Sequence, residues 1–126
     1  MTVSAGRLRA DPAQGWVVPH AWTPDGVVVR AEGTGAHVLH LSVALCVLND
    51  TFREAEALGL PVEGARVVAQ GSLDTESWVS TGITYAVDVD STVPLDLVAK
   101  LLARVDEVAE IPQALRTGMS VERTHG

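Results

Sequence analysis

The chain has 126 residues, 47% of them hydrophobic and 20% charged, which is typical of one globular domain with its own core. Sixteen Asp and Glu outweigh nine Lys and Arg, so the formal net charge is −7 and no concentrated basic patch is visible. This balance argues against disorder and against nucleic acid or an anionic membrane surface as a partner.

The composition also bears on the source and the compartment. Few Lys among many Ala, Val and Arg are typical of bacteria with GC-rich genomes. The N-terminal residues lack the apolar core of a signal peptide, and Cys46 is the only cysteine, so no internal disulfide can form. We therefore expect a cytoplasmic protein with a single domain over residues 1–126.

The first thirty residues predict three β-strands arranged as a meander. Val3–Arg9 alternates small or apolar residues with polar ones, and Trp16–Trp22 forms the second strand after a turn. Pro19 cannot donate a ladder hydrogen bond, which favours an edge strand or a bulge there. A turn with Pro and Gly then leads into Val27–Val29, the third strand.

The central stretch predicts a long helix from Gly35 to Gly59. Nearly every residue in Ala36–Leu48 is apolar, a run too long for a typical strand and shorter than the roughly 20 residues that cross a bilayer. After this run the pattern becomes amphipathic, and Gly59 stands where a left-handed C-terminal cap belongs. Cys46 lies near the middle of the apolar half.

Two more strands are expected after this helix. They span Arg66–Leu73 and Ser77–Asp90, separated by a polar turn. In the second of them the alternation of apolar and polar residues changes phase at Gly82, and a β-bulge is the usual cause.

The C-terminal part predicts two helices and a last strand. Apolar residues recur at helical spacing from Leu95 to Val108, and Ser91 or Thr92 is the candidate N-cap. A short helix that begins with Pro and ends at Gly is expected over 111–118, and Met119–Arg123 can close the sheet.

Together these elements predict an α+β fold, in which one mainly antiparallel sheet wraps around the buried central helix. The apolar half Ala36–Leu48 needs cover on every side, and a sheet of this size supplies too little of it. We therefore expect a homodimer, in which a second copy covers the rest of the helix.

Three stretches of the sequence match one family pattern. They are HLSVALCVLNDTFREAEALGLPVEGARV (40–67), the strand pair VVAQGSLD and TGITYAVDVD (67–74 and 81–90), and LLARVDEVAEIPQALRTGMSV (101–121). From about Asp25 to the C-terminus the chain resembles the OsmC/Ohr proteins, thiol-dependent organic hydroperoxide reductases and their relatives. The resemblance implies an intertwined homodimer with pockets at its interface, no cofactor, and Cys46 as the reactive thiol.

The sequence departs from that family in its catalytic residues. Ile111 stands where the family has the second cysteine, which resolves the oxidised thiol as a disulfide. Ala36 or His37 stands where the family tends to have a Glu that pairs with an arginine. Arg7, Arg9 and Arg30 are the candidates for that arginine.

These departures leave three hypotheses open. In the first, Cys46 reduces an organic hydroperoxide and an external small thiol resolves its sulfenic acid. In the second, the fold keeps a dimer-interface pocket that binds or transforms an apolar small molecule, and the thiol is not essential. In the third, which has the least support, the chain is a structural or interaction module. Because aliphatic neighbours surround Cys46, its pKa is predicted near or above that of an ordinary thiol.

The predicted ligand-binding residues are His20, Arg9, His37 and Ile111, with an N-terminal Arg or His20 as the polar anchor of the ligand. His37 and His40 have the i, i+3 spacing of metal ligands but lack a third partner, so no metal site is predicted. For Trp16, Trp22 and Trp78, packing in the core or in a dimer is expected rather than a ligand box.

Overall fold

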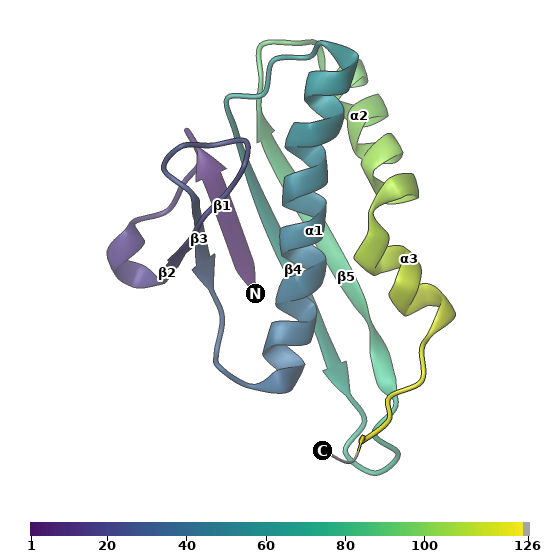
Figure 1. The fold of residues 1–126 in the computed structure, drawn as a ribbon. Coiled ribbons are helices and arrows are strands. Elements are labelled where there is room, and N and C mark those ends of the chain that lie inside the picture. The colour runs from purple at the N-terminus through teal and green to yellow at the C-terminus, as the bar shows by residue number, and fades with distance from the viewer. Residues whose placement is uncertain (125–126) are drawn as a thin grey trace.

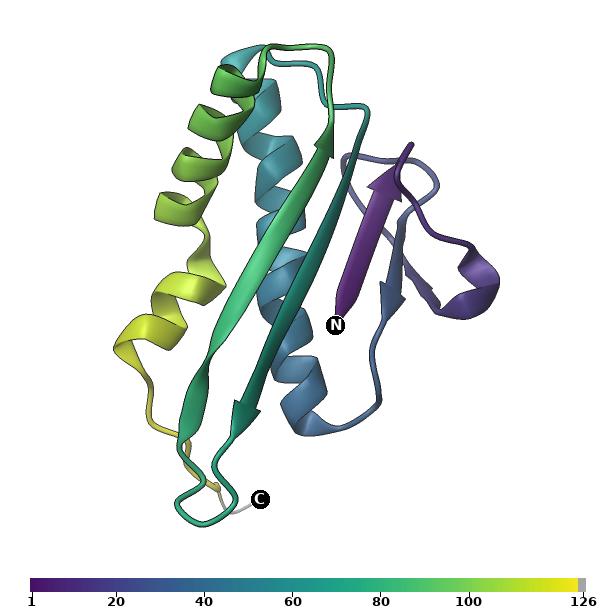
Figure 2. The ribbon, with the colours of Figure 1, turned by 180° about the vertical axis from the view of Figure 1, so that it is seen from behind.

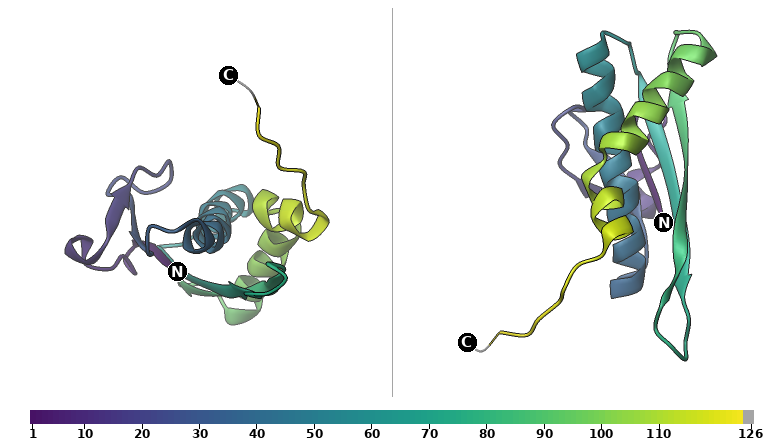
Figure 3. Two further views of the ribbon diagram at one scale, coloured as in Figure 1. Left: turned by 90° about the horizontal axis from the view of Figure 1, so that it is seen from below. Right: turned by 90° about the vertical axis from the view of Figure 1, so that its right-hand side faces the viewer.

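In the computed structural model, which describes residues 1–124, a layer of helices covers one face of a five-stranded antiparallel sheet (Figures 1 and 3). The strands are β1 (Thr2–Gly6), β2 (Trp16–Val18), β3 (Val27–Arg30), β4 (Gly64–Leu73) and β5 (Ser80–Asp90). The helices are η1 (Pro12–Gln14), α1 (Gly35–Leu58), α2 (Leu95–Val108) and α3 (Glu110–Thr117). The expected α+β class is confirmed.

Helix α1 is the centre of the core. Its first turn is capped by Thr34, whose side chain accepts a hydrogen bond from His37 N at 3.2 Å. Its last turn ends at Gly59, which has a φ of 68° and donates to the carbonyl oxygens of Ala55 and Glu56. Between these caps, buried apolar residues fix α1 on the sheet: Leu41, Val43, Ala44, Val47, Leu48, Phe52 and Ala55.

The sheet presents a small apolar face to α1. Alternate residues of β1, β3 and β4 point to this face and are fully buried: Val3, Ala5, Val27, Val29, Ala65, Val67 and Ala69. Ala at three of these positions lets the helix approach the strands closely. On the opposite face, seen in Figure 2, exposed polar side chains such as Arg66, Gln70, Thr84 and Asp88 meet solvent. The face toward α1 is therefore built for packing, whereas the opposite face meets solvent along β4 and β5 and is buried at Ser4 and Val28 of β1 and β3.

The strand order corrects the predicted meander. The sheet runs β2-β3-β1-β4-β5, so β1 pairs with β3 and β4 and does not form a hairpin with β2. Val3, Ser4 and Ala5 are fully buried, which suits a strand with neighbours on both sides. β2 ends at Val18, directly before Pro19, and lies at the sheet edge as expected.

Two details of the C-terminal part were predicted wrongly. Residues 119–123 form no strand, because after α3 ends at Gly118 (φ 74°) the chain continues as an extended tail that leads away from α3 (Figure 3). Ser91 and Thr92 do not cap α2: Pro94 holds the N-cap position, and the Ser91 hydroxyl donates to the Pro61 carbonyl oxygen. The predicted irregularity at Gly82 is confirmed by a register shift in the β4–β5 ladder and a φ of 102°.

The three tryptophans lie at the surface of the subunit. Trp16 is on the edge strand β2, Trp22 follows in the next loop, and Trp78 is in the β4–β5 turn, where it is 70% exposed. Core packing was therefore a wrong expectation for them, and packing in a dimer stays a prediction. Within residues 1–124, the helices are too short or too polar to cross a membrane. The cytoplasmic location likewise stays a prediction.

His40 is a buried polar residue of α1, and its ring lies next to Gly71 of β4. Both of its ring nitrogens lack a hydrogen-bond partner among residues 1–124. Gly71 makes room for the ring, since a Cβ there would lie 3.0 Å from His40 Nε2. Burial lowers the pKa of His40, and the charges of His37 and the terminal amino group lower it further.

This environment predicts a pH-dependent stability. Because the lowered pKa of His40 makes the folded chain bind this proton less tightly than the unfolded chain, whose His titrates near pH 6.5, the free energy of unfolding should decrease as the pH falls below that value. One such proton contributes a slope of at most about 1.4 kcal/mol per pH unit. In denaturant titrations between pH 7.5 and 5, His40→Leu should show a shallower slope than wild type. Both proteins retain the contribution of His20, whose pKa is also lowered by burial. Equal slopes would contradict this role of His40.

Candidate ligand groove beside Cys46

Cys46 lies on the side of α1 that faces the junction of α2 and α3. It is half-buried, and its Sγ accepts a hydrogen bond from Ile111 N at 3.5 Å. Ile111 is in the first turn of α3, so the two positions matched through the family resemblance lie in contact, although they are 65 residues apart.

The surroundings of Cys46 favour the neutral thiol. Burial raises the pKa of the Cys46 thiol, and the negative charges of Asp50 and Glu110 raise it further. Backbone N–H groups of Ile111 and Glu110 act in the opposite direction without reversing the shift. Arg53, one further turn along α1, is paired with Asp50 at 3.1 Å. The direction predicted for this pKa from the aliphatic neighbours is confirmed.

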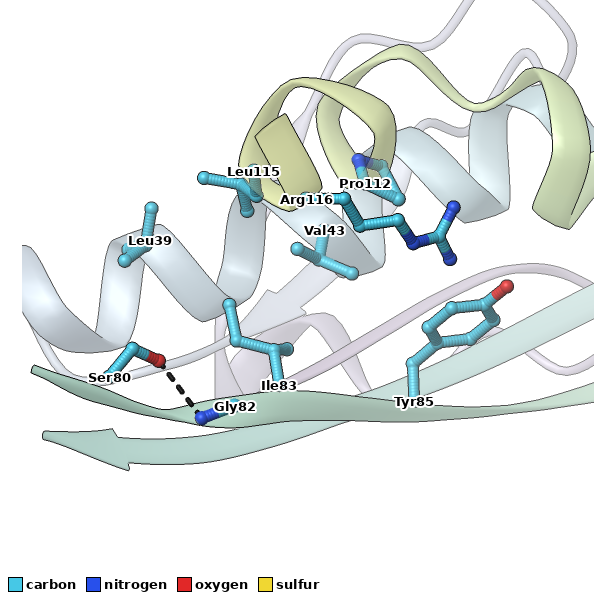
Figure 4. A pocket seen from close by; sticks show the side chains of 9 residues that line it. All are labelled: Leu39, Val43, Ser80, Gly82, Ile83, Tyr85, Pro112, Leu115 and Arg116. Carbon is cyan, nitrogen blue, oxygen red and sulfur yellow. Dashed lines mark hydrogen bonds between the residues drawn. The ribbon is translucent and has the colours of Figure 1, made fainter. Parts of the chain in front are cut away.

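A groove opens next to this contact, between the first half of α1, α3 and β5 (Figure 4). Its volume is about 310 Å³, and its wall is mainly apolar. The lining residues are Leu39 and Val43 from α1, Ser80, Gly82, Ile83 and Tyr85 from β5, and Pro112, Leu115 and Arg116 from α3. Cys46 and Ile111 lie beside this groove and are not part of its lining.

The bulge in β5 shapes the floor of the groove. Gly82 has a φ of 102°, a conformation that side chains other than Gly rarely adopt, and the space around its missing Cβ is empty. Its N–H donates to Ser80 Oγ at 3.1 Å, which closes the irregular turn of the strand (Figure 4). At Gly82 the floor of the groove consists of backbone atoms, and the Ile83 side chain lies next to them (Figure 4).

One end of the groove is polar. Arg116 Nη2 donates to Asp106 Oδ1 at 2.9 Å, Arg116 Nη1 donates to the Asp106 carbonyl oxygen at 3.3 Å, and the Tyr85 hydroxyl donates to the same carboxylate. The hydrogen bond from Tyr85 lowers the pKa of Asp106, and the bond from Arg116 lowers it further. Burial and this carboxylate raise the pKa of Tyr85. Asp106 therefore stays ionised and ties β5 and α3 to the end of α2.

The other predicted binding residues lie elsewhere. The His20 ring packs edge-on against Phe52 with 5.5 Å between centroids, and its Nδ1 lies 2.8 Å from Thr23 Oγ1. Arg9 donates to the Asp25 carbonyl oxygen at 2.9 Å. His37 contacts Thr34 and lies 3.6 Å from Glu32.

The structure thus brings Cys46 and Ile111 together, but none of the predicted binding residues lines the groove: Ile111, His20, Arg9 and His37. In residues 1–124, no three His, Cys, Asp or Glu side chains are grouped as metal ligands. Sequence reasoning missed Arg116, although this residue lies within the third stretch that matched the family pattern (101–121). The alternation of Ile83 and Tyr85 along β5 was the available signal for the floor of the groove.

The comparison with solved structures identifies the fold. No family model matches the sequence, and no curated protein does. An OsmC-like protein from Mycoplasma pneumoniae superposes with a TM-score of 0.61 at 18% identity, over 68% of this chain and 64% of that chain. An OsmC-like hydroperoxide resistance protein from Jannaschia sp. CCS1 superposes with a TM-score of 0.53 at 13% identity, over 75% of this chain and 69% of that chain. The chain thus spans less than two thirds of the Mycoplasma protein, and the OsmC-like fold expected from the sequence is confirmed.

The state of the thiol is directly testable. Because the folded chain raises the pKa of Cys46, iodoacetamide should alkylate this residue more slowly in the folded protein at pH 7 than in the same protein unfolded by denaturant. The rate in the folded protein should still be rising above pH 9. Rates are followed by mass spectrometry, with Cys46→Ser as the blank. Faster labelling of the folded protein at pH 7 would contradict the neutral thiol.

Proposed function

We propose that this chain, which has the fold of OsmC-like proteins, binds a small apolar molecule in the groove between α1, α3 and β5 and does not use Cys46 as a peroxidatic thiol. The observation that carries the proposal is the groove itself. Its aliphatic walls come from three elements, and its volume of about 310 Å³ is at the small end of the range for ligand sites.

The binding energy would come mainly from burial. Leu39, Ile83 and Leu115 offer aliphatic surface to a ligand, and Leu39 is 37% exposed. Each 100 Å² of apolar surface that a ligand removes from water contributes about 2.5 kcal/mol. A molecule with a short hydrocarbon body suits such a site.

The peroxidase hypothesis remains the alternative. In it, the Cys46 thiolate attacks the distal oxygen of a hydroperoxide, the O–O bond breaks, the alcohol leaves, and an external thiol reduces the sulfenic acid. The fold shared with a protein named for hydroperoxide resistance supports it. The raised pKa of Cys46 and the acidic neighbours Asp50 and Glu110 act against it, because the thiolate is the nucleophile. The alkylation rate of Cys46 separates the two hypotheses.

We also propose that the active form is a homodimer. Apolar side chains on α1 remain open to solvent and form a stripe: Val38 (43% exposed), Leu39 (37% exposed) and the partly buried Leu45. A second copy packed on this stripe would cover the apolar half of α1. It would also close the open side of the groove, because Leu39 belongs to both the stripe and the groove lining.

Filling the groove should abolish ligand binding. The neutral probe N-phenyl-1-naphthylamine should gain fluorescence with wild type, and Leu115→Trp should remove most of this gain because the indole occupies the groove. Leu95→Trp is the matched control, since Leu95 is exposed on α2 and lies outside the groove. Equal fluorescence gain in wild type and Leu115→Trp, or none in wild type, would contradict the proposed site.

The dimer is tested by molar mass. Light scattering at micromolar concentration should give twice the subunit mass of 13.3 kDa. Val38→Glu should shift the protein toward monomer, because it introduces a charge into the stripe without touching the groove. Thr84→Glu is the control, because Thr84 lies on the solvent-exposed face of the sheet. A monodisperse wild-type monomer would overturn the proposal.

A further inference from the structure

We infer that the ligand of this groove is a monocarboxylate with an apolar tail, and that Arg116 holds its carboxylate. The inference rests on the proposed binding function and adds the chemical class of the ligand. It follows from the single cation in the groove lining, its remaining hydrogen-bond donors and the absence of acidic lining residues in the described part of the chain.

Arg116 extends from α3 along the groove and ends beside Tyr85, as Figure 4 shows. Its guanidinium uses one N–H of Nη1 and one N–H of Nη2 for Asp106. A guanidinium has five N–H donors in a planar fork, and within residues 1–124 it bonds to no acceptor besides Asp106. Donors therefore remain for an oxygen of a ligand.

Asp106 positions this group. It accepts from both Tyr85 and Arg116, so side chains from β5 and α3 are held to one carboxylate at the end of α2. A guanidinium fixed in this way loses little conformational freedom when a carboxylate binds to its free edge. The Arg116 side chain is 49% exposed, so solvent shares the site and the expected gain in affinity is moderate.

The other lining residues restrict the charge and the polarity of a ligand that can bind in the groove. Among the described lining residues there is no Asp or Glu, and the carboxylate at the polar end, Asp106, is already bonded to Arg116 and Tyr85. A ligand carboxylate would therefore bind to the remaining N–H groups of Arg116, whereas a cationic group would face this guanidinium. Arg116 is also the only Lys or Arg among the described lining residues, and because Asp106 already pairs with it, the site offers hydrogen-bond donors to one carboxylate and no excess charge for a second. Beyond the guanidinium, Ile83 and Leu115 offer hydrocarbon contacts to the tail.

Octanoate and 1-octanol separate the charge of the head from the burial of the tail. Both have the same chain length, and octanoate is ionised at pH 7.5. Isothermal titration calorimetry on wild type should give octanoate an affinity about tenfold higher than that of octanol. Arg116→Gln should lose this preference while its affinity for octanol is unchanged.

Two further variants sharpen the test. Arg104→Gln, on α2 and outside the groove, should behave as wild type although it removes the same charge. Arg116→Lys keeps the charge but loses the planar fork, so part of the preference should remain and should shrink as salt is added. This variant also serves if Arg116→Gln does not fold.

The possible failures are distinguishable. If wild type binds octanol and octanoate equally, or if Arg116→Gln weakens both equally, Arg116 does not recognise the carboxylate and the inference is wrong while the apolar groove stands. If wild type binds neither molecule, the proposed function itself is wrong.

Discussion

The packing of α1 on the sheet is the constraint on which the rest of this structure depends. A helix whose first half is almost entirely apolar needs cover on most of its sides. Ala5, Ala65 and Ala69 let it lie close to the strands, and α2 and α3 cover its flank. Where α3 and the bulged end of β5 diverge from α1, cover is incomplete and the groove opens. The same packing thus produces the core, the groove and the open stripe of α1.

Local patterns in the sequence predicted the elements well. The apolar run and Gly59 correctly predicted α1 and its C-terminal cap, and the change of phase at Gly82 correctly predicted the bulge. The strand order and the supposed last strand at 119–123 were wrong, because the pairing of strands is a non-local property that alternation alone does not determine. In the site, the contact of Cys46 with Ile111 followed from the family resemblance. Arg116 was missed because its role arises from β5, α2 and α3 meeting in space.

Cys46 and Arg116 have different surroundings, and these surroundings favour different chemistry at the two residues. Cys46 lies among aliphatic side chains and near Asp50 and Glu110, so its environment opposes a charge on sulfur. Arg116 has a fixed guanidinium that faces an apolar groove, a combination suited to recognising an amphipathic molecule. Arg116 lies on α3, as does Ile111, whose backbone N–H donates to Cys46, so the two environments lie on neighbouring parts of the same helix.

The most direct test of the account is whether a small amphipathic molecule occupies the groove. Methyl resonances of wild type, assigned by NMR and followed during titration with octanoate, report on each wall separately. The account predicts that the signals of Val43, Ile83 and Leu115 shift in a saturable manner while that of Leu95 on the exposed face of α2 stays in place. No saturable shift, or shifts confined to residues outside the groove, would contradict it.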